Sequence, residues 1–384
     1  MPRHSVVPTK RHNPRNNVQT SFLNRLQPEK ILVCQQRQIG DVLLATPSIR
    51  LLAERFPDAE IHVLTEKKCA PVLLHNPRVT RTWLIEPKKG WTGMLSLYRA
   101  IRREGFELVV DFQQLIRLRG AVLASAAAVR LSFKPKWYNR LFYNLQGEEL
   151  CGYAAKAKSG LLAPLGITWN GEPPEIFLTE EERNWTRDFL AEEGIAPDAP
   201  FLTLDPTHRR ITRKWPAEHY AELIRLFAVS HPGLKLFLLY GPGEREEVES
   251  IRALAGNPPQ CVVSEHMTSL REMGAILDRA AGHIGNCSSP RHFAVAVGTP
   301  TLIILGSTKP GAWTYPGEGH LAIRNEGEDN CISCNRSTCE RGTLECLKAV
   351  TPECVHATAR RLMPRLRELE ISRSVAGHPP ASSD

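Results

Sequence analysis

The chain has 384 residues, of which 42% are hydrophobic and 23% are charged. This composition is typical of a folded globular protein and excludes a disordered or fibrous chain, and the length is sufficient for two hydrophobic cores. The formal net charge is +8, but the first 30 residues hold six Lys or Arg against one Glu. Because the remaining positive charge is sparse and lacks interleaved aromatics, no nucleic-acid partner is indicated.

Both ends of the chain have the composition of disordered segments. Residues 1–27 are expected to form a basic tail, and residues 372–384 a tail rich in Ser, Pro and Ala. No apolar stretch reaches the roughly 18 residues of a membrane helix, and the N-terminus lacks the apolar core of a secretory signal. We therefore expect a cytoplasmic protein, with attraction of the basic tail to an anionic membrane surface as a further hypothesis.

Short β-rich runs alternate with longer runs of helical periodicity, which is the pattern of parallel strands joined by helical crossovers. In the first half, strands are predicted at 31–36, 60–65, 107–112 and 129–133, and helices at 42–56, 91–104 and 115–128. A Pro-rich junction contains a predicted helix at 179–193. In the second half, strands are predicted at 201–204, 234–240, 261–263, 282–285 and 301–305, and helices at 217–230, 244–255, 269–280, 290–297 and 357–369.

This order predicts an α/β fold with two Rossmann-like, doubly wound domains. We place the first domain at 28–180 and the second at 181–350, followed by a C-terminal helix within 351–371. In such folds a ligand binds at the carboxyl ends of the strands, so the site is expected in the cleft between the domains.

The first predicted strand is followed by the turn Arg37-Gln38-Ile39-Gly40-Asp41. A glycine at such a turn lets a ligand approach the backbone, and a carboxylate after it lies at the mouth of the cleft. Asp41 could then act as a general base. The alternative is that Asp41 caps the following helix through a side-chain oxygen, which requires no substrate.

A cationic loop follows the first strand of the second half. Counted with a protonated histidine, it carries five cations, namely His208, Arg209, Arg210, Arg213 and Lys214. Arginine can bind phosphate oxygens through two N–H groups, so this loop suits a diphosphate. A solvated charged loop is the alternative.

Two further strand-to-helix turns are candidate ligand sites. The Gly-rich turn before Glu244 lacks the Gly-Lys-Ser/Thr of a phosphate loop, but Glu244 could hold a ribose or sugar hydroxyl. In the later loop, Pro290 suits the first helical turn and Ser288 or Ser289 the N-cap, which leaves backbone N–H groups for an anion. His292 in that turn points either at a ligand or into the core.

Five of the ten cysteines crowd near the C-terminus, at Cys331, Cys334, Cys339, Cys346 and Cys354. Thiolates at these spacings could bind zinc or an iron–sulfur cluster, but a structural zinc site usually has two Cys-x-x-Cys pairs, and here there is one. We therefore predict free thiols, with no metal and no cofactor.

Taken together, these segments resemble glycosyltransferase family 9, the bacterial heptosyltransferases of the lipopolysaccharide inner core. The resemblance covers about residues 31–369. It lies in four motifs: Ile39-Gly40-Asp41-Val42, Thr212-Arg213-Lys214-Trp215-Pro216, Gly285 to His292 followed by Gly298-Thr299-Pro300, and the late cysteines. It implies the glycosyltransferase-B fold, in which two Rossmann-like domains face a central cleft. By this resemblance the domain at 28–180 is on the acceptor side and the domain at 181–350 binds the nucleotide-sugar.

The resemblance also implies an activity. Asp41 matches the family's catalytic aspartate, which deprotonates an acceptor hydroxyl in an inverting, metal-independent transfer. The implied partners are a nucleotide-sugar donor, namely ADP-heptose, a lipid-linked or oligosaccharide acceptor, and the inner membrane surface. From the loops above and this resemblance, the predicted donor-binding residues are Thr212, Arg213, Lys214, Glu244, Cys287, Ser288, Ser289 and His292.

The chain departs from the family at two places. Arg213 stands where the family usually has Lys, and Cys287-Ser288-Ser289 stands where it typically has Asp-Ser/Thr-Gly. Cysteine is a weaker hydrogen-bond acceptor than aspartate, so these residues leave the identity of the sugar donor undetermined. A second hypothesis is a catalytically weakened protein that binds nucleotide-sugars or glycans, and a third is metal or redox sensing by the cysteines. A dehydrogenase is disfavoured because Gly-x-Gly-x-x-Gly is absent after the first strand.

Overall fold

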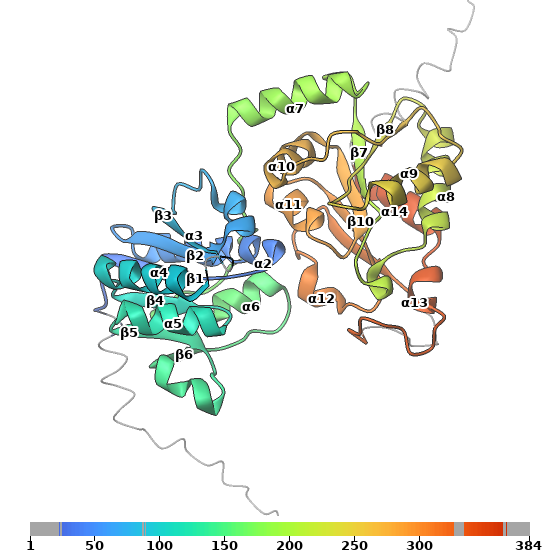
Figure 1. Cartoon of the computed structure of the whole chain (residues 1–384). Coiled ribbons are helices and arrows are strands. Elements are labelled where there is room, and N and C mark those ends of the chain that lie inside the picture. The colour runs from blue at the N-terminus through green and yellow to red at the C-terminus, as the bar shows by residue number, and fades with distance from the viewer. Residues whose placement is uncertain are drawn as a thin grey trace, which may run out of the picture.

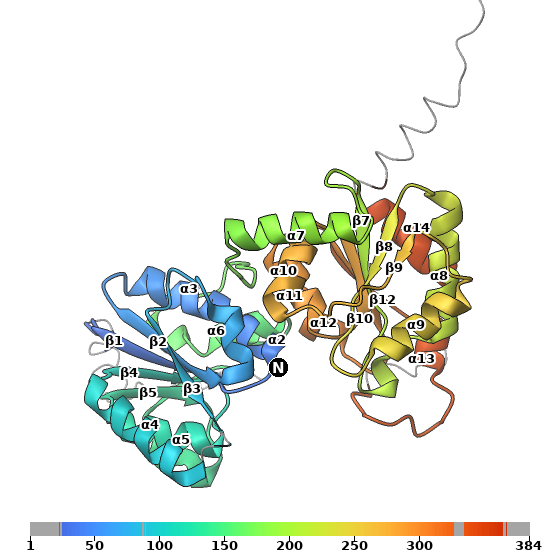
Figure 2. The same cartoon turned by 45° about the horizontal axis from the view of Figure 1, so that its top comes forward.

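The computed structural model describes residues 23, 25–86, 88, 90–325, 334–363 and 366. Two parallel six-stranded sheets, one in each half of the chain, have helices on both faces (Figures 1 and 2). The predicted α/β class is therefore confirmed. Most of the predicted tail at 1–27 and all of the tail at 372–384 lie outside the described residues. Within the described part of the chain, no helix is long and apolar enough to cross a membrane.

The first sheet has the strand order β3-β2-β1-β4-β5-β6. Its strands are β1 (Lys30–Cys34), β2 (Glu60–Glu66), β3 (Arg81–Ile85), β4 (Leu108–Asp111), β5 (Val129–Phe133) and β6 (Leu145–Gly147). Side chains alternate between its two faces. One face packs on α2 (Ile39–Leu43), α3 (Thr46–Arg55) and η1 (Lys67–Leu73), and the other on α4 (Gly90–Glu104) and α5 (Ile116–Ser125). Shorter elements follow in η3 (Trp137–Phe142), α6 (Ala154–Gly160) and η4 (Ala163–Leu165).

The second sheet has the order β12-β11-β10-β7-β8-β9. Its strands are β7 (Phe201–Asp205), β8 (Lys235–Leu238), β9 (Cys261–Val262), β10 (Gly282–Asn286), β11 (Thr301–Leu305) and β12 (His320–Arg324). One face is covered by α8 (Ala217–Ser230), α9 (Arg245–Leu254) and α14 (Pro352–Leu362). The other is covered by α7 (Glu180–Glu192), α10 (Leu270–Arg279) and α11 (Pro290–Ala296), which turn toward the first half (Figure 2). The remaining short elements are η5 (Ile211–Arg213), α12 (Pro310–Trp313) and α13 (Glu345–Lys348).

The two halves share one hydrophobic core. A single cluster of buried residues runs from Ile31 and Leu52 in the first half, through Phe189 of α7, to Met273 and Phe293 in the second half. Burial of apolar surface between the halves therefore stabilises their relative position as well as each half.

The elements differ from the predictions mainly at the sheet edges. The strands β3, β6 and β12 were not predicted, because edge strands are short and partly exposed and lack a continuous apolar run. The helix predicted at 42–56 is two helices, since α2 ends at Leu43 and α3 begins anew at Thr46 with Pro47 in its first turn. The last helix starts at Pro352 rather than 357.

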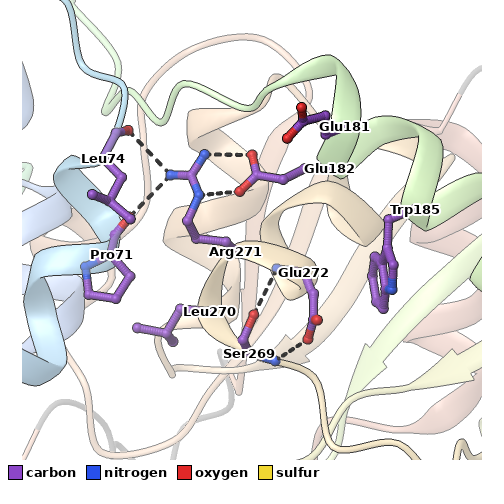
Figure 3. A pocket seen from close by; sticks show the side chains of 9 residues that line it. All are labelled: Pro71, Leu74, Glu181, Glu182, Trp185, Ser269, Leu270, Arg271 and Glu272. Atoms are coloured by element: carbon purple, nitrogen blue, oxygen red, sulfur yellow. Dashed lines mark hydrogen bonds and ion pairs between the residues drawn. The ribbon is translucent and has the colours of Figure 1, made fainter.

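Arg271 of α10 joins the halves (Figure 3). Its guanidinium forms a two-pronged ion pair with Glu182 of α7, and its Nη1 donates to the carbonyl oxygens of Pro71 (3.1 Å) and Leu74 (3.3 Å) in the first half. The contact with Arg271 lowers the pKa of Glu182. An open pocket of about 480 Å³ lies beside this contact, with Trp185 on its far side.

Removal of the Arg271 guanidinium should weaken the joint between the halves. Arg271→Ala leaves the Glu182 carboxylate and three carbonyl groups, those of Pro71, Leu74 and Phe177, without this donor. We expect the free energy of unfolding in urea to fall by about 3 kcal/mol. Arg271→Lys should lower the free energy of unfolding by less, because an ammonium retains the charge but not the two-pronged geometry. The matched control is Arg187→Ala on the exposed part of α7, and equal stability of R187A and R271A would contradict this role.

Candidate active site

The halves meet where α2 packs against the first turn of α11. A Cβ added to Gly40 would lie 3.2 Å from Cδ2 of His292 and 3.6 Å from Oγ of Ser289. Since the first distance is tighter than ordinary van der Waals contact, a side chain at Gly40 would require the His292 ring to shift by a few tenths of an ångström. Gly40 therefore sets the separation between the next residue, Asp41, and the loop that follows β10.

Asp41 is the third residue of α2, and the N-cap of that helix is Gln38. Neither α2 nor α3 has a side-chain cap hydrogen bond, so the interpretation of Asp41 as a helix cap is wrong. Instead, Oδ1 of Asp41 lies 3.5 Å from Nζ of Lys158, and the Asp41 side chain remains 29% exposed. The carboxylate is thus oriented by a lysine and open to a ligand.

Lys158 of α6 was not singled out by the sequence analysis. Burial lowers the pKa of its ammonium, and the neighbouring Asp41 opposes that shift. Nζ also donates to Oε1 of Gln35 at 3.0 Å, just beyond β1. The position had no local signal, because the pairing depends on α6 folding back beside the end of β1.

The predicted donor loop after β7 places its residues in different environments. Thr212 is buried and donates from Oγ1 to the carbonyl of Arg336 at 2.6 Å, and Lys214 forms a 2.8 Å ion pair with Glu247. Arg213 donates from Nη2 to Oδ1 of Asn335 at 2.9 Å, whereas its buried Nε has no hydrogen-bond partner. The unpaired Nε of Arg213 thus leaves an N–H group of this guanidinium for a ligand.

Two arginines make this region electropositive. Burial lowers the pKa of the Arg213 guanidinium, and the nearby Arg210 and Arg291 lower it further against an opposing effect of Cys287. Arg291 is 3% exposed, forms no ion pair within the described residues, and its Nη1 has no hydrogen-bond partner. A buried cation without a carboxylate is costly, so Arg291 and Arg213 are suited to an anionic ligand. Arg291 was not among the predicted site residues.

Two histidines in the site are uncharged. Burial and Arg213 lower the pKa of His208 to about 4, and burial lowers the pKa of His292 well below its usual value. His208 donates from Nε2 to the carbonyl of Cys287 (3.2 Å) and accepts from the backbone N–H of Arg210 (2.9 Å). His208 is therefore not the fifth cation of its loop, whereas Nδ1 of His292 is buried without a partner and free for a ligand.

The loop after β10 is anchored by residues of neighbouring strands. Oδ1 of the fully buried Asn286 accepts from the backbone N–H of Trp215 at 2.9 Å, which ties this loop to the donor loop. Ser288 donates from Oγ to the carboxylate of Asp205 at the end of β7. Ser289 is the N-cap of α11 but forms no side-chain cap bond. Neither Asn286 nor Asp205 was predicted, because their partners come from other strands.

Cys287 and Glu244 differ in how they face the site. Cys287 is buried against Ile303 and Leu305, so it behaves as a small apolar side chain. Glu244 accepts through Oε2 from Oγ1 of Thr207 at 2.7 Å and from the backbone N–H of Gly241 at 2.8 Å. Glu244 therefore holds the Gly-rich turn in place.

The late cysteines do not gather in the part of the chain that the structure describes. Cys334 and Cys354 are exposed, Cys339 is half-buried and Cys346 is buried, while Cys331 lies outside the described residues. Among the described residues there is no group of three or more potential metal ligands.

Residues 94–344 match the model of glycosyltransferase family 9 (heptosyltransferase). The chain belongs to this family. It is 25% identical over 288 residues to lipopolysaccharide heptosyltransferase 3 of Escherichia coli, covering 71% of this chain and 82% of that protein.

Two solved structures illustrate the family fold. The glycosyl transferase family 9 protein of Veillonella parvula superposes with a TM-score of 0.76 at 21% identity, covering 89% of this chain and 99% of that one. E. coli heptosyltransferase WaaC with ADP-2-deoxy-2-fluoro heptose superposes with a TM-score of 0.65 at 18% identity, covering 86% and 99%. These likenesses confirm the glycosyltransferase-B fold that the motifs imply.

The buried Asp205 carboxyl should make the stability of this family member depend on pH. Burial raises its pKa to about 7, well above that of an unfolded aspartate. Between pH 4 and pH 7 the unfolded chain loses this proton while the folded chain keeps it, so this carboxyl lowers the free energy of unfolding as the pH rises. Asp205→Asn keeps an oxygen acceptor for Ser288. Its free energy of unfolding should therefore rise relative to that of the wild type over this range, by at most about 4 kcal/mol at pH 7.

Urea unfolding at pH 5 and pH 7.5 measures this difference. Asp198→Asn, at an exposed position, serves as control: its free energy of unfolding should differ from that of the wild type by the same amount at both pH values. An offset for D205N that does not grow with pH would contradict the raised pKa.

Proposed function

We propose that the protein is an inverting glycosyltransferase that moves a heptose or related sugar from a nucleotide-sugar, ADP-heptose, to a lipopolysaccharide-core or similar glycan acceptor. One observation carries this proposal: the accessible carboxylate of Asp41 follows Gly40, which packs against the first turn of α11 in the other half. Arg291 lies in that turn and Arg213 lies in η5, and each has an N–H group without a partner. Such a pairing of a base with anion-seeking cations suits attack on a sugar that is linked to a diphosphate.

The proposed step is a single displacement at the anomeric carbon. Asp41 accepts the proton of an acceptor hydroxyl while that oxygen forms a bond to the anomeric carbon. The bond from this carbon to the diphosphate breaks, and the leaving oxygen takes the electron pair. Arg213 and Arg291 stabilise the negative charge on the diphosphate, so the reaction is proposed to be metal-independent. Lys158 holds Asp41 in the position to accept the proton.

The donor is proposed to lie against the second sheet. Arg213 and His292 retain unused nitrogen atoms, and Ser288, Ser289 and Glu244 border the same strand ends. WaaC, a structural relative, has been solved with ADP-2-deoxy-2-fluoro heptose, which supports ADP-heptose as the donor here. Thr212 and Lys214 already have protein partners, and we propose that they shape the loop rather than contact the donor.

The donor-binding role of Arg213 can be tested by calorimetry with ADP and ADP-heptose. Arg213→Ala removes charge-assisted hydrogen bonds to the diphosphate, and we expect the Kd to rise by about 10- to 100-fold. The matched control is Arg245→Ala at the exposed start of α9, which should bind like the wild type. Unchanged ADP affinity in R213A would contradict the proposed donor site.

The role of Asp41 can be tested by steady-state transfer assays. Asp41→Asn keeps the shape of the side chain but cannot accept the proton, so kcat should fall by about 100- to 10,000-fold while the Kd of the donor stays the same. Asp58→Asn, at an exposed position outside the site, is the control. Equal kcat in D41N and D58N would show that Asp41 is not the base.

A second candidate function is binding of nucleotide-sugars or glycans without transfer. The observation that favours it is the burial of Cys287 among apolar residues at a position where the family has a polar aspartate. Micromolar donor binding by the wild type, with neither transfer nor hydrolysis for any acceptor tested, would support this second candidate.

The acceptor is proposed to be lipid-linked, and the protein is proposed to act in the cytoplasm at the surface of the inner membrane. The names of its relatives, lipopolysaccharide heptosyltransferases, support this placement. The basic N-terminal segment is proposed to contribute electrostatic attraction to the anionic membrane.

A further inference from the structure

Large apolar side chains are exposed together on the first half of the protein. In η3, Trp137 is 80%, Leu141 87% and Tyr138 48% exposed, and Ile116 at the start of the adjoining α5 is 76% exposed. Single exposed apolar residues are ordinary, but large ones gathered on adjoining segments mark an interaction surface. These four residues are called the apolar patch below.

The apolar patch stands on an ordered base. Between its exposed neighbours, Asn139 is buried, accepts from the Arg119 guanidinium through Oδ1 and donates from Nδ2 to Oε1 of Gln114 at 3.3 Å. The same guanidinium lies 5.4 Å from the ring centroid of Phe142. Ile116 precedes Arg119 by one helical turn and so shares its face of α5. The outward side chains are thus held in place by a folded support.

Cations surround the apolar patch. From Phe112 to Gly147 the sequence has six Lys or Arg and no Asp or Glu. Four of the six are exposed and have no ion-pair partner among the described residues, namely Arg117, Lys134, Lys136 and Arg140. This surface therefore favours an anionic partner.

The combination of side chains specifies the kind of anionic partner. Tryptophan and tyrosine prefer the boundary between water and hydrocarbon, where the ring is buried and the polar tip stays hydrated. Lysine and arginine beside them bind anionic headgroups, and Nζ of Lys136 lies 6.0 Å from the ring of Tyr138. This is the composition of segments that lie in the membrane interface without crossing it.

The apolar patch lies toward the catalytic edge of the first sheet. η3 follows β5, near β6 in Figure 1, and α5 follows β4. The hydroxyl of Tyr143, just after η3, donates to Oδ2 of Asp111 at the end of β4 at 2.6 Å. β1 ends at the same edge of this parallel sheet, and it leads to Asp41.

We propose that the apolar patch and its four cations dock the first half of the protein on the surface of an anionic lipid bilayer. Trp137 and Leu141 enter the headgroup region, and the cations bind lipid phosphates. The orientation follows from the shared strand edge: docking here brings Asp41 near the membrane. This orientation rests on the proposed function, in which the acceptor is lipid-linked, whereas the docking itself does not.

The test is flotation of the full-length protein with vesicles of phosphatidylcholine, with or without about 30% phosphatidylglycerol. The wild type should float with the anionic vesicles only. Two double variants, W137A/L141A and K134E/K136E, should each weaken this binding by about tenfold or more, because one removes the inserted side chains and the other reverses two charges. Thermal unfolding confirms that each variant is folded.

The matched control is V229A/K348E, which changes an exposed apolar residue and an exposed lysine of the second half and should bind vesicles like the wild type. A further full-length variant replaces the five Lys and Arg residues at positions 3–25 with Gln. Loss of vesicle binding in this variant alone, with wild-type binding by both patch variants, would overturn the proposal. A patch variant that changes the oligomeric state and leaves vesicle binding intact would also overturn it, in favour of a protein interface.

Transfer assays separate this proposal from the proposed function. The patch variants should retain wild-type affinity for ADP-heptose and wild-type transfer to a water-soluble oligosaccharide acceptor. Their transfer to an acceptor embedded in anionic vesicles should fall by about the same factor as their vesicle binding. If no variant transfers sugar but the flotation pattern is as expected, the docking surface stands and the proposed enzyme function fails. If the wild type does transfer sugar to the vesicle-embedded acceptor, equal transfer by both patch variants overturns the docking proposal.

Discussion

The close approach of Gly40 to His292 is the constraint on which the site depends. At position 40, which has no side chain, a helix of the first half approaches the first turn of α11 so closely that a Cβ would lie 3.2 Å from Cδ2 of His292. The adjacent Asp41 is carried toward that turn as a consequence. The shared core and the Arg271 contact keep the halves at this separation. Asp41 and the first turn of α11 thus lie close together although they belong to different halves of the chain.

Burial determines which groups near this contact carry charge. His208 and His292 are neutral because removal from water disfavours the imidazolium, and the nearby arginines add to the effect. An arginine keeps its proton under the same conditions, so the positive charge resides on Arg213 and Arg291. The cationic character of the site therefore persists across physiological pH. Of the two neutral histidines, His208 already uses both ring nitrogens within the protein, and His292 has its Nδ1 without a partner.

Much of the fold could be predicted from local pattern. Interior strands such as β11 and helices such as α8 have the bounds predicted from their apolar periodicity, because burial on both faces or on one helical stripe imposes that pattern. The edge strands β3, β6 and β12 escaped prediction because their sequences mix polar and apolar residues without a continuous apolar run, whereas the edge strand β9 was predicted. Asp41, Arg213, Thr212 and Lys214 were all singled out from strand-end position and motif. The structure gives Thr212 and Lys214 hydrogen-bond and ion-pair partners within the protein, which no motif indicates.

The sequence by itself determined the α/β class, the family and the loops that form the site, because these depend on hydrophobic periodicity and on short motifs within single loops. Only the tertiary structure decided that Lys158 pairs with Asp41, that Asp205 accepts from Ser288 and that Arg291 is buried with no ion pair to any described residue. Each of these facts depends on side chains from elements far apart in the chain. Their separation is decided by helix packing and strand order, which local sequence pattern does not encode.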